Sequence, residues 1–157
     1  MDYKSTLNLP QTEFPMKASL PQREPEQIAR WQQNQAYEKM VSKRRNAGRP
    51  MFVMHDGPPY ANGNIHLGHT LNKVLKDIVI KYKNMAGFRT EFIPGWDCHG
   101  LPIELGVEKK LREEKKDKST LSKVEIRNLC KEYAQTFINK QREQFKRLGI
   151  LSDWDHP

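Results

Sequence analysis

The pattern of hydrophobic and polar positions predicts a strand–helix–strand unit in the middle of the chain. The segment from Met51 to His55 is typical of a short buried strand, and Thr90 to Ile93 indicates a second one. A helix is predicted between them, from about His66 to Met85, and Gly87 ends it. Its apolar residues recur at steps of three and four: Leu67, Leu71, Val74, Leu75, Ile78, Tyr82 and Met85. A helix that joins two strands in this way implies a parallel sheet, so the predicted fold class is α/β.

The segment before this unit differs from it in composition. Residues 1–22 carry three prolines among polar residues and are interpreted as an extended arm, since each proline removes a backbone donor. Pro25 then opens a helix over Glu26 to Arg45. We therefore divide the chain into an amino-terminal arm and helix, residues 1–48, and a second region, residues 49–157.

Two further helices are predicted after the second strand. One follows Leu101 and runs to about Glu114. Ser122, with Glu125 three residues later, forms a capping box that opens a long helix closed by Gly149. These helices complete the predicted order of elements.

Composition and charge restrict the function classes. The net charge is +8, from 27 Lys and Arg against 19 Asp and Glu, which favours an anionic partner such as a nucleotide or RNA. Cys98 and Cys130 are the only cysteines and form no C-x-x-C pair, so a disulfide scaffold is disfavoured. Apolar runs of signal-peptide or membrane-spanning length are lacking. We expect a soluble protein of the cytoplasm that does not contact a membrane.

The densest chemical signal lies between His55 and His69, which read His-Asp-Gly-Pro-Pro-Tyr-Ala-Asn-Gly-Asn-Ile-His-Leu-Gly-His. It is a strand end, a rigid diproline, a polar turn and a helix start. In an open α/β sheet, ligands bind at the carboxyl ends of the strands, and helix amino termini there offer N–H groups to phosphates. His66 and His69 lie on one helix face, where their ring N–H groups can bond phosphate oxygens. The Walker-type phosphate loop is lacking.

Two other interpretations of these residues remain open. A metal-dependent hydrolase could use four side chains with suitable ligand chemistry: His66, His69, Cys98 and His99. A non-catalytic module that binds a nucleotide or RNA would also fit the basic charge. A histidine pair alone occurs often by chance and does not decide between these alternatives.

Several blocks together resemble the class I aminoacyl-tRNA synthetases. His66-Leu67-Gly68-His69 resembles their HIGH signature, with Leu in place of Ile, and the longer run from Gly57 resembles the isoleucyl members. The block Pro94-Gly-Trp-Asp-Cys-His-Gly-Leu-Pro-Ile-Glu104 resembles a second isoleucyl motif. The start, Tyr3 to Pro10, and the end, Leu148 to Trp154, are similar to the bacterial enzymes. The resemblance covers essentially the whole chain.

The resemblance implies an activity and its partners. Isoleucyl-tRNA synthetases use ATP with Mg²⁺ to convert L-isoleucine to isoleucyl-adenylate, and then transfer the aminoacyl group to tRNA(Ile). The expected fold is the first half of a Rossmann-like catalytic domain with a parallel sheet, preceded by the arm and helix. The expected oligomeric state is a monomer.

The resemblance also implies site residues. His66 and His69 are the catalytic candidates, contacting the triphosphate. The ATP and adenylate pocket is expected to be formed by Gly57, Pro58, Pro59, Tyr60, Asn62, Gly63, His66, Gly68 and His69. Pro58 and Asp97 are expected to bind the amino acid, with the Asp97 carboxylate facing its ammonium group.

The remaining residues of these blocks receive weaker predictions. His99 and Glu104 are rim candidates, Trp96 is interpreted as packing, and His55 is left outside the site. No metal ligand is predicted.

Other parts of such synthetases have no counterpart in this sequence. A Lys-Met-Ser-Lys-Ser loop is lacking, since Met40-Val41-Ser42-Lys43 does not match it. An editing domain, an anticodon-binding domain and the carboxy-terminal zinc-binding cysteines are also lacking. Zinc is therefore expected only in the carboxy-terminal part of such an enzyme, which this sequence does not contain. We therefore expect an amino-terminal fragment that has little or no activity alone.

Overall fold

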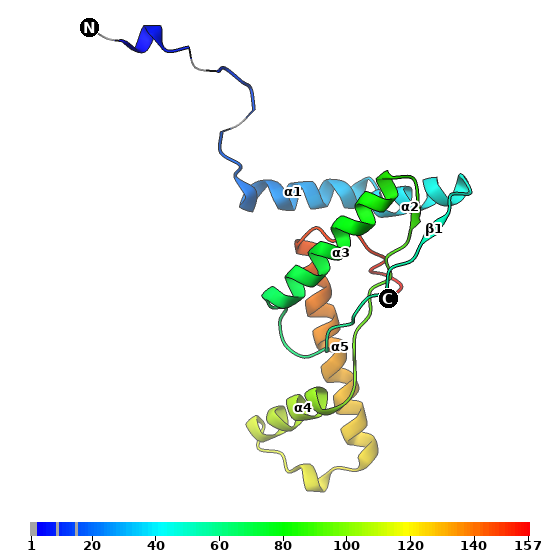
Figure 1. Cartoon of the computed structure of the whole chain (residues 1–157). Coiled ribbons are helices and arrows are strands. Elements are labelled where there is room, and N and C mark those ends of the chain that lie inside the picture. Colours follow the sequence, from blue (N-terminus) through cyan, green and yellow to red (C-terminus); the bar gives the residue numbers. More distant parts are fainter. Residues whose placement is uncertain (1–2, 9, 15) are drawn as a thin grey trace.

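The computed structural model describes residues 3–8, 10–14 and 16–157. An extended amino-terminal segment leads away from a helical body, in which α4 lies beside the lower half of α5 (Figure 1). The described elements are η1 (Tyr3–Thr6), α1 (Leu20–Gln33), α2 (Ala36–Asn46), β1 (Met51–Phe52), α3 (Leu67–Met85), β2 (Arg89–Thr90), α4 (Leu101–Glu113), η2 (Lys118–Thr120) and α5 (Lys123–Arg147).

The amino-terminal region differs from the prediction in two ways. The arm ends at Ser19 because Pro21 lies in the first turn of α1, where its missing N–H is not needed. The predicted single helix is two helices, since Gln35 adopts φ 50, the left-handed conformation, and separates α1 from α2. Residues 1–2, 9 and 15 of the predicted arm lie outside the described part of the chain.

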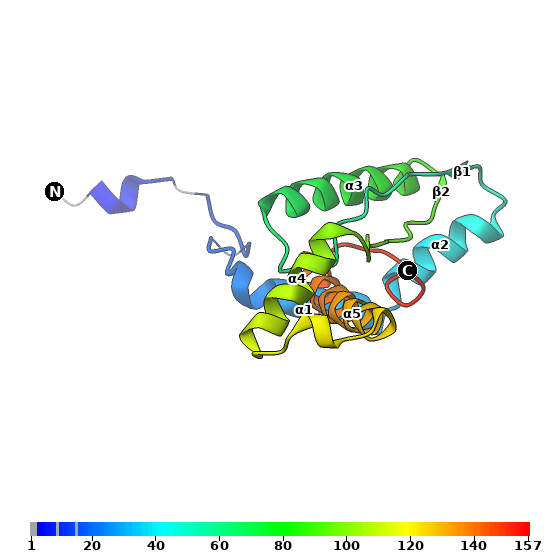
Figure 2. The same cartoon turned by 90° about the horizontal axis from the view of Figure 1, so that it is seen from below.

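The parallel strand–helix–strand unit is confirmed, but its strands are shorter than predicted. β1 pairs with β2 in parallel, with Met51 opposite Arg89 and Phe52 opposite Thr90. Figure 2 shows β1 and β2 side by side at one end of α3. Further along the two segments, an isolated parallel bridge joins Tyr60 to Asp97. The intervening segments contain prolines, which cannot donate to a ladder. The two paired strands and the many helices are compatible with an α/β fold, and the wider Rossmann-like sheet stays a prediction.

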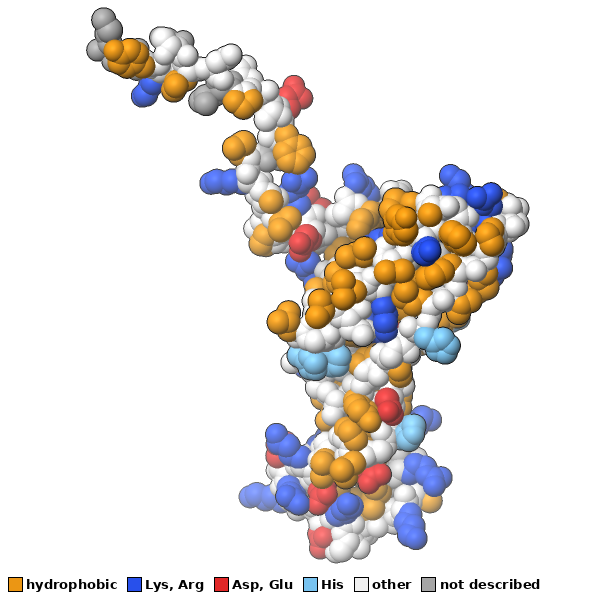
Figure 3. All heavy atoms as spheres, in the orientation of Figure 1, with side chains coloured by type: hydrophobic (Ala, Val, Ile, Leu, Met, Phe, Trp, Pro, Cys, Tyr) orange, Lys and Arg blue, Asp and Glu red, His pale blue; other side chains and the backbone are white. Residues whose placement is uncertain are grey.

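The predicted α3 and the predicted capping box of α5 are both confirmed. His66 is the N-cap of α3, and Ser122 and Glu125 cap α5 reciprocally. The apolar stripe of α3, however, is not its buried side within this chain, since Leu71 is 61% exposed and Ile78 is 56% exposed. Figure 3 shows this stripe as a band of hydrophobic side chains along α3. The side of α3 that faces the core carries Lys73, Asp77, Ile80 and Asn84.

The buried core lies where α3, α5 and the carboxy-terminal segment meet. Its fully or nearly buried apolar residues are Ile80, Phe92, Phe145, Ile150 and Trp154. The backbone carbonyl of Phe92 accepts hydrogen bonds from the Ser152 hydroxyl at 2.9 Å and from the Asp153 N–H at 3.0 Å. A second cluster, formed by Ala61, Ile103 and Ala134, attaches α4 and the turn before α3 to α5.

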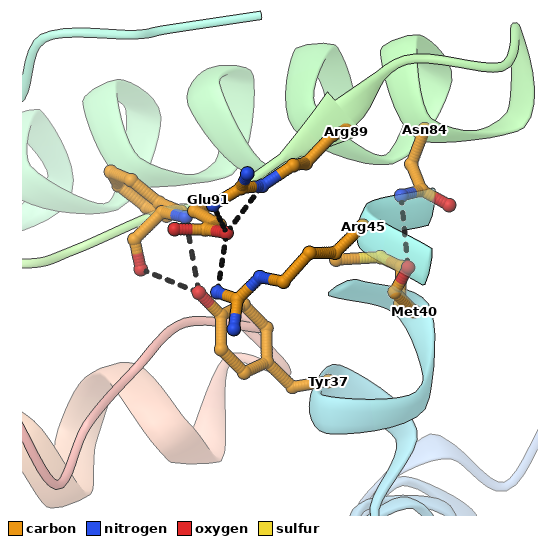
Figure 4. Close-up of polar contacts among 7 residues, drawn as sticks. Tyr37, Met40, Arg45, Asn84, Arg89 and Glu91 are labelled. Atoms are coloured by element: carbon orange, nitrogen blue, oxygen red, sulfur yellow. Dashed lines mark hydrogen bonds and ion pairs between the residues drawn. The ribbon is translucent and has the colours of Figure 1, made fainter. Parts of the chain in front are cut away.

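Polar contacts attach α2 to the segment around β2 (Figure 4). The Glu91 carboxylate forms ion pairs with the guanidinium groups of Arg45 at 2.6 Å and Arg89 at 2.5 Å. These two groups hold the pKa of the Glu91 carboxyl below its ordinary value. The Tyr37 hydroxyl accepts from the Phe92 N–H at 3.1 Å. The amino-terminal helices are thus packed on the second region, and the division at residue 48 stays a prediction.

The helices of the described residues were also compared with the length and apolarity that a membrane span requires. None of them meets both requirements.

Candidate functional site

The two signature histidines cap the start of α3 and hold one another in place. The His66 Nδ1 accepts from the Gly68 N–H at 3.1 Å, and the His69 Nδ1 accepts from the His66 N–H at 3.3 Å. The rings stack with their centroids 3.8 Å apart. Two imidazoles therefore form a capping box, a role that Ser and Glu fill at the start of α5.

This capping arrangement fixes the tautomer of both rings. A neutral imidazole carries its hydrogen on one nitrogen only, and a nitrogen that accepts a hydrogen bond carries none. Because both Nδ1 atoms accept from backbone N–H groups, both Nε2 atoms carry the hydrogen. Burial lowers the pKa of His69 from 6.5, and electrostatic repulsion from His66 and Lys73 adds to this effect, so the His69 ring is neutral at pH 7. The pair presents Nε2–H donors, which suit anionic oxygens.

Gly68 is required by the position of the His66 ring. A Cβ at residue 68 would lie 3.0 Å from Cε1 and 3.1 Å from Nδ1 of His66, closer than ordinary contacts. A side chain there would require the His66 ring to move by a few tenths of an ångström. The predicted role of Gly68 beneath an adenosine stays a prediction, and this steric role is additional.

The diproline loop is anchored at its first residue by a buried ion cluster. Lys73 and Lys76 of α3 both bind the Asp56 carboxylate, Lys76 at 2.8 Å, and the Lys73 side chain is 3% exposed. Burial lowers the pKa of Lys73, and the bond to Asp56 opposes that effect. After Asp56, the loop continues with Gly57 and Pro58, which are exposed, and Pro59, which is buried. This ion pairing of Asp56 and Lys73 was not predicted from the sequence, although Lys73 and Lys76 lie three residues apart and so share one face of the helix.

The Trp96–Asp97 turn lies directly against the end of the diproline loop. The Asp97 N–H donates to the Pro59 carbonyl and the Ala61 N–H donates to the Asp97 carbonyl, both at 2.9 Å. The structure therefore brings together two blocks that are far apart in the sequence, as the site prediction requires. The Asp97 side chain is 31% exposed and accepts from the His99 N–H at 3.4 Å, which leaves other lone pairs free for a cation.

The remaining predicted residues lie on the same loop or on its rim. Tyr60 is 45% exposed, and Asn62 and Gly63 are half-buried, Gly63 with φ 82. His99 is 92% exposed and borders a cavity of about 470 Å³ between α4 and α5, together with Glu104 and Cys98. His66 and His69 are not among the residues that line this cavity. Among the described residues, no hydrogen bond or ion pair joins the imidazoles to Asp97.

The geometry does not favour the metal hydrolase. Within the described part of the chain, no three His, Cys, Asp or Glu side chains converge closely enough to hold a metal ion. Both histidine Nδ1 atoms are occupied by backbone donors. The four residues of that scheme therefore do not form a ligand set.

The strand–helix–strand unit and the histidine-capped α3 lie within the part of the chain that a known family model covers. The family model for class I tRNA synthetases (I, L, M and V) matches residues 26–157, and the chain belongs to this family.

Curated relatives extend the match over the whole chain. All 157 residues align with isoleucine–tRNA ligases from Aquifex aeolicus at 59% identity, Geobacter sulfurreducens at 58% and Persephonella marina at 57%. The predicted resemblance to the isoleucyl enzymes is thereby confirmed. The chain spans 16% of the length of each of these relatives.

Proposed function

We propose that this chain forms the ATP-binding part of a synthetase that activates L-isoleucine, with ATP and Mg²⁺, and transfers it to tRNA(Ile). The observation that carries the proposal is the pair of Nε2–H donors that His66 and His69 present at the start of α3. The 59% identity to the Aquifex aeolicus isoleucine–tRNA ligase, over an alignment of all 157 residues, supports isoleucine as the substrate. The net charge of +8 fits the two polyanionic partners, ATP and tRNA.

The chemistry needs no nucleophile from the protein. An oxygen of the isoleucine carboxylate attacks the α-phosphorus of ATP and forms a new P–O bond, which gives isoleucyl-adenylate. The bond between the α-phosphorus and the bridging oxygen of the β-phosphate breaks, and pyrophosphate leaves. Negative charge accumulates on the phosphate oxygens, so catalysis consists of positioning and of stabilising that charge. Preorganised neutral N–H donors do this without reorganisation, because the capping bonds already hold both rings in place.

The neighbouring residues take roles that follow their positions. Gly68 lies under the adenosine, and the exposed Asp97 carboxylate binds the substrate ammonium group. The wall of the adenylate pocket is formed by Gly57, Pro58, Pro59, Tyr60, Asn62 and Gly63, with Pro58 also contacting the amino acid. We further propose that residues 49–157 form half of a Rossmann-like domain, in a monomeric enzyme of the cytoplasm.

The test uses a complete synthetase in which this chain replaces the aligned residues of the Aquifex aeolicus ligase. Isoleucine-dependent exchange of pyrophosphate into ATP is expected in this chimera, and little or none in the 157-residue chain alone. Exchange with valine, leucine or methionine but not isoleucine would overturn the assigned substrate. ATP binding without any exchange in the chimera would favour the non-catalytic nucleotide-binding module instead.

A further inference from the structure

A buried glutamine of α5 connects the two loops of the candidate site. Gln141 is 0% exposed. Its Nε2 donates to the Tyr60 carbonyl at 3.0 Å and to the Gly63 carbonyl at 3.1 Å. Its Oε1 accepts from the Trp96 Nε1–H at 2.9 Å. We propose that Gln141 is a positioning residue that sets the distance between the diproline turn and the Trp96–Asp97 turn, an inference that rests on the proposed function.

Only an amide of this length satisfies all three partners. Its nitrogen has two hydrogens, both used on carbonyls, and its oxygen accepts the indole N–H. A glutamate at the same place has no hydrogen to donate when ionised, and an asparagine is one methylene shorter. Because the Gln141 side chain is fully buried, a substitution that leaves one of its polar groups unpaired costs free energy.

A second glutamine, one turn further along α5, extends the same attachment. The Gln144 Oε1 accepts from the Ile65 N–H at 2.9 Å, and its Nε2 donates to the Asn64 side chain at 3.0 Å. The helix α5 therefore holds the turn from Tyr60 to Ile65, which leads directly into His66. Gln144 belongs to the same device, but only Gln141 also reaches the Trp96–Asp97 turn.

The position of this bond network relates it to the reaction. His66 and His69 follow the turn that Gln141 holds, and Asp97 is adjacent to the indole that it binds. In the proposed reaction the substrate carboxylate must lie in line with the α-phosphorus while its ammonium group is bound at Asp97. A shift of one loop against the other changes that alignment, and a misplacement of 1 Å can reduce the rate about 10²-fold. Gln141 thus acts through the loops and does not touch the substrates.

The experiment compares three variants in the chimeric synthetase. Gln141→Met removes all three bonds at similar volume, and kcat for isoleucine-dependent exchange is expected to fall about 10–100-fold, with KM for isoleucine changing less than about threefold. Gln135→Met on the same helix is the matched control, since Gln135 is exposed and, among the described residues, its side chain is hydrogen-bonded to Asn139 alone. It should leave kcat unchanged. A kcat of Gln141→Met equal to that of the control would overturn the proposal.

Gln141→Glu supplies a readout that a purely structural role does not move. Burial beside two carbonyls raises the pKa of the new carboxyl, and its protonated form regains one donor. The activity of this variant, divided by wild-type activity at each pH, is expected to rise as the pH falls from 8 to 6. A ratio that stays constant over that range would contradict the positioning role.

A measurement on the 157-residue chain separates this inference from the proposed function. Hydrogen exchange of the Trp96 indole N–H, followed by nuclear magnetic resonance, should be slow in the wild type and in Gln135→Met. Exchange should be at least about tenfold faster in Gln141→Met, because methionine offers no amide oxygen to accept the indole hydrogen bond. If the wild-type chimera does not exchange pyrophosphate into ATP, only the proposed function is refuted. If the hydrogen exchange rate of the Trp96 indole is the same in the variant and the wild type, the positioning role of Gln141 is refuted.

Discussion

His66 and His69 stack ring against ring at the start of α3, and each binds a backbone N–H through its Nδ1 atom. One pair of side chains therefore has two tasks, to cap a helix and to direct two Nε2–H donors outward. Substitutions that keep one task and remove the other can separate the two.

The first prediction separates capping from catalysis at His66. Asn is a strong N-cap residue that can accept from the Gly68 N–H, whereas Ala cannot. His66→Ala is expected to lower the free energy of unfolding by about 0.5–2 kcal/mol, and His66→Asn by much less. Both variants lose the Nε2–H donor, so both should reduce kcat for adenylate formation in the chimera by about 10²–10³-fold. Denaturant unfolding and pyrophosphate exchange provide the two measurements. Near-normal kcat in His66→Asn would contradict the catalytic role.

The second prediction concerns pH and His69. Its pKa in the folded chain is below 6.5, so the folded state disfavours the protonated ring. The stability contributed by neutral His69 is complete above the unfolded-state pKa near 6.5 and is lost as the pH falls through the lower folded-state value. The free energy of unfolding should therefore decrease on acidification below about pH 6.5. His69→Gln should show a smaller decrease over the same range, and equal slopes for the two proteins would refute the assignment.

The third prediction concerns Asp97 and the amino acid. Asp97→Asn retains the shape of the side chain and an acceptor for the His99 N–H, but removes the negative charge. A hydrogen bond to a charged group contributes about 1.5–3 kcal/mol, so KM for isoleucine in the chimera should rise about 10–150-fold. The KM for ATP should stay close to the wild-type value. Glu113→Gln is the control, since it removes the same charge at an exposed position of α4 and should change neither constant. An unchanged KM for isoleucine in Asp97→Asn would exclude the proposed contact.

The sequence analysis predicted the elements well where a local pattern defines them. The capping box at Ser122 and Glu125 marks the start of α5 correctly, because two adjacent side chains satisfy two backbone donors without help from the rest of the chain. The break at Gln35 was missed, since neither Gly nor Pro marks its left-handed conformation in the sequence. The strand lengths were overestimated because the Phe92 backbone does not continue the ladder: its N–H donates to the Tyr37 hydroxyl, and its carbonyl accepts from Ser152 and Asp153.

The site residues predicted from the sequence stay predictions, and they come from short motifs. His66, His69 and Asp97 came from motifs, and the structure brings Asp97 beside the diproline loop. Gln141 was missed, because a glutamine in a long polar helix gives no local sign that it is fully buried and bonded to residues 78 and 81 positions away. Such roles depend on tertiary packing, which periodicity alone does not reveal.

The fourth prediction tests the ion cluster at the root of the diproline loop. Asp56→Ala leaves the buried Lys73 without its partner and should lower the free energy of unfolding by about 3–5 kcal/mol. Lys73→Met added to that variant removes the unpaired charge, so the double variant should be more stable than Asp56→Ala alone. A double-mutant cycle in urea measures this coupling. Additive effects of the two substitutions would show that the pair is not coupled.

The fifth prediction concerns the apolar stripe of α3 in the isolated chain. Leu67, Leu71, Leu75, Ile78, Tyr82 and Met85 are all more than half exposed and follow one face of the helix. Contiguous apolar surface of this kind promotes association. The 157-residue chain should therefore increase in mean mass with concentration in sedimentation equilibrium, and Leu71→Lys combined with Ile78→Lys should abolish that increase.

Because both side chains project into solvent, the free energy of unfolding should change by less than about 0.5 kcal/mol. Val124→Lys, at an exposed site on α5 away from the stripe, is the control and should associate like the wild type. Equal association of the double variant and this control would show that another surface is responsible.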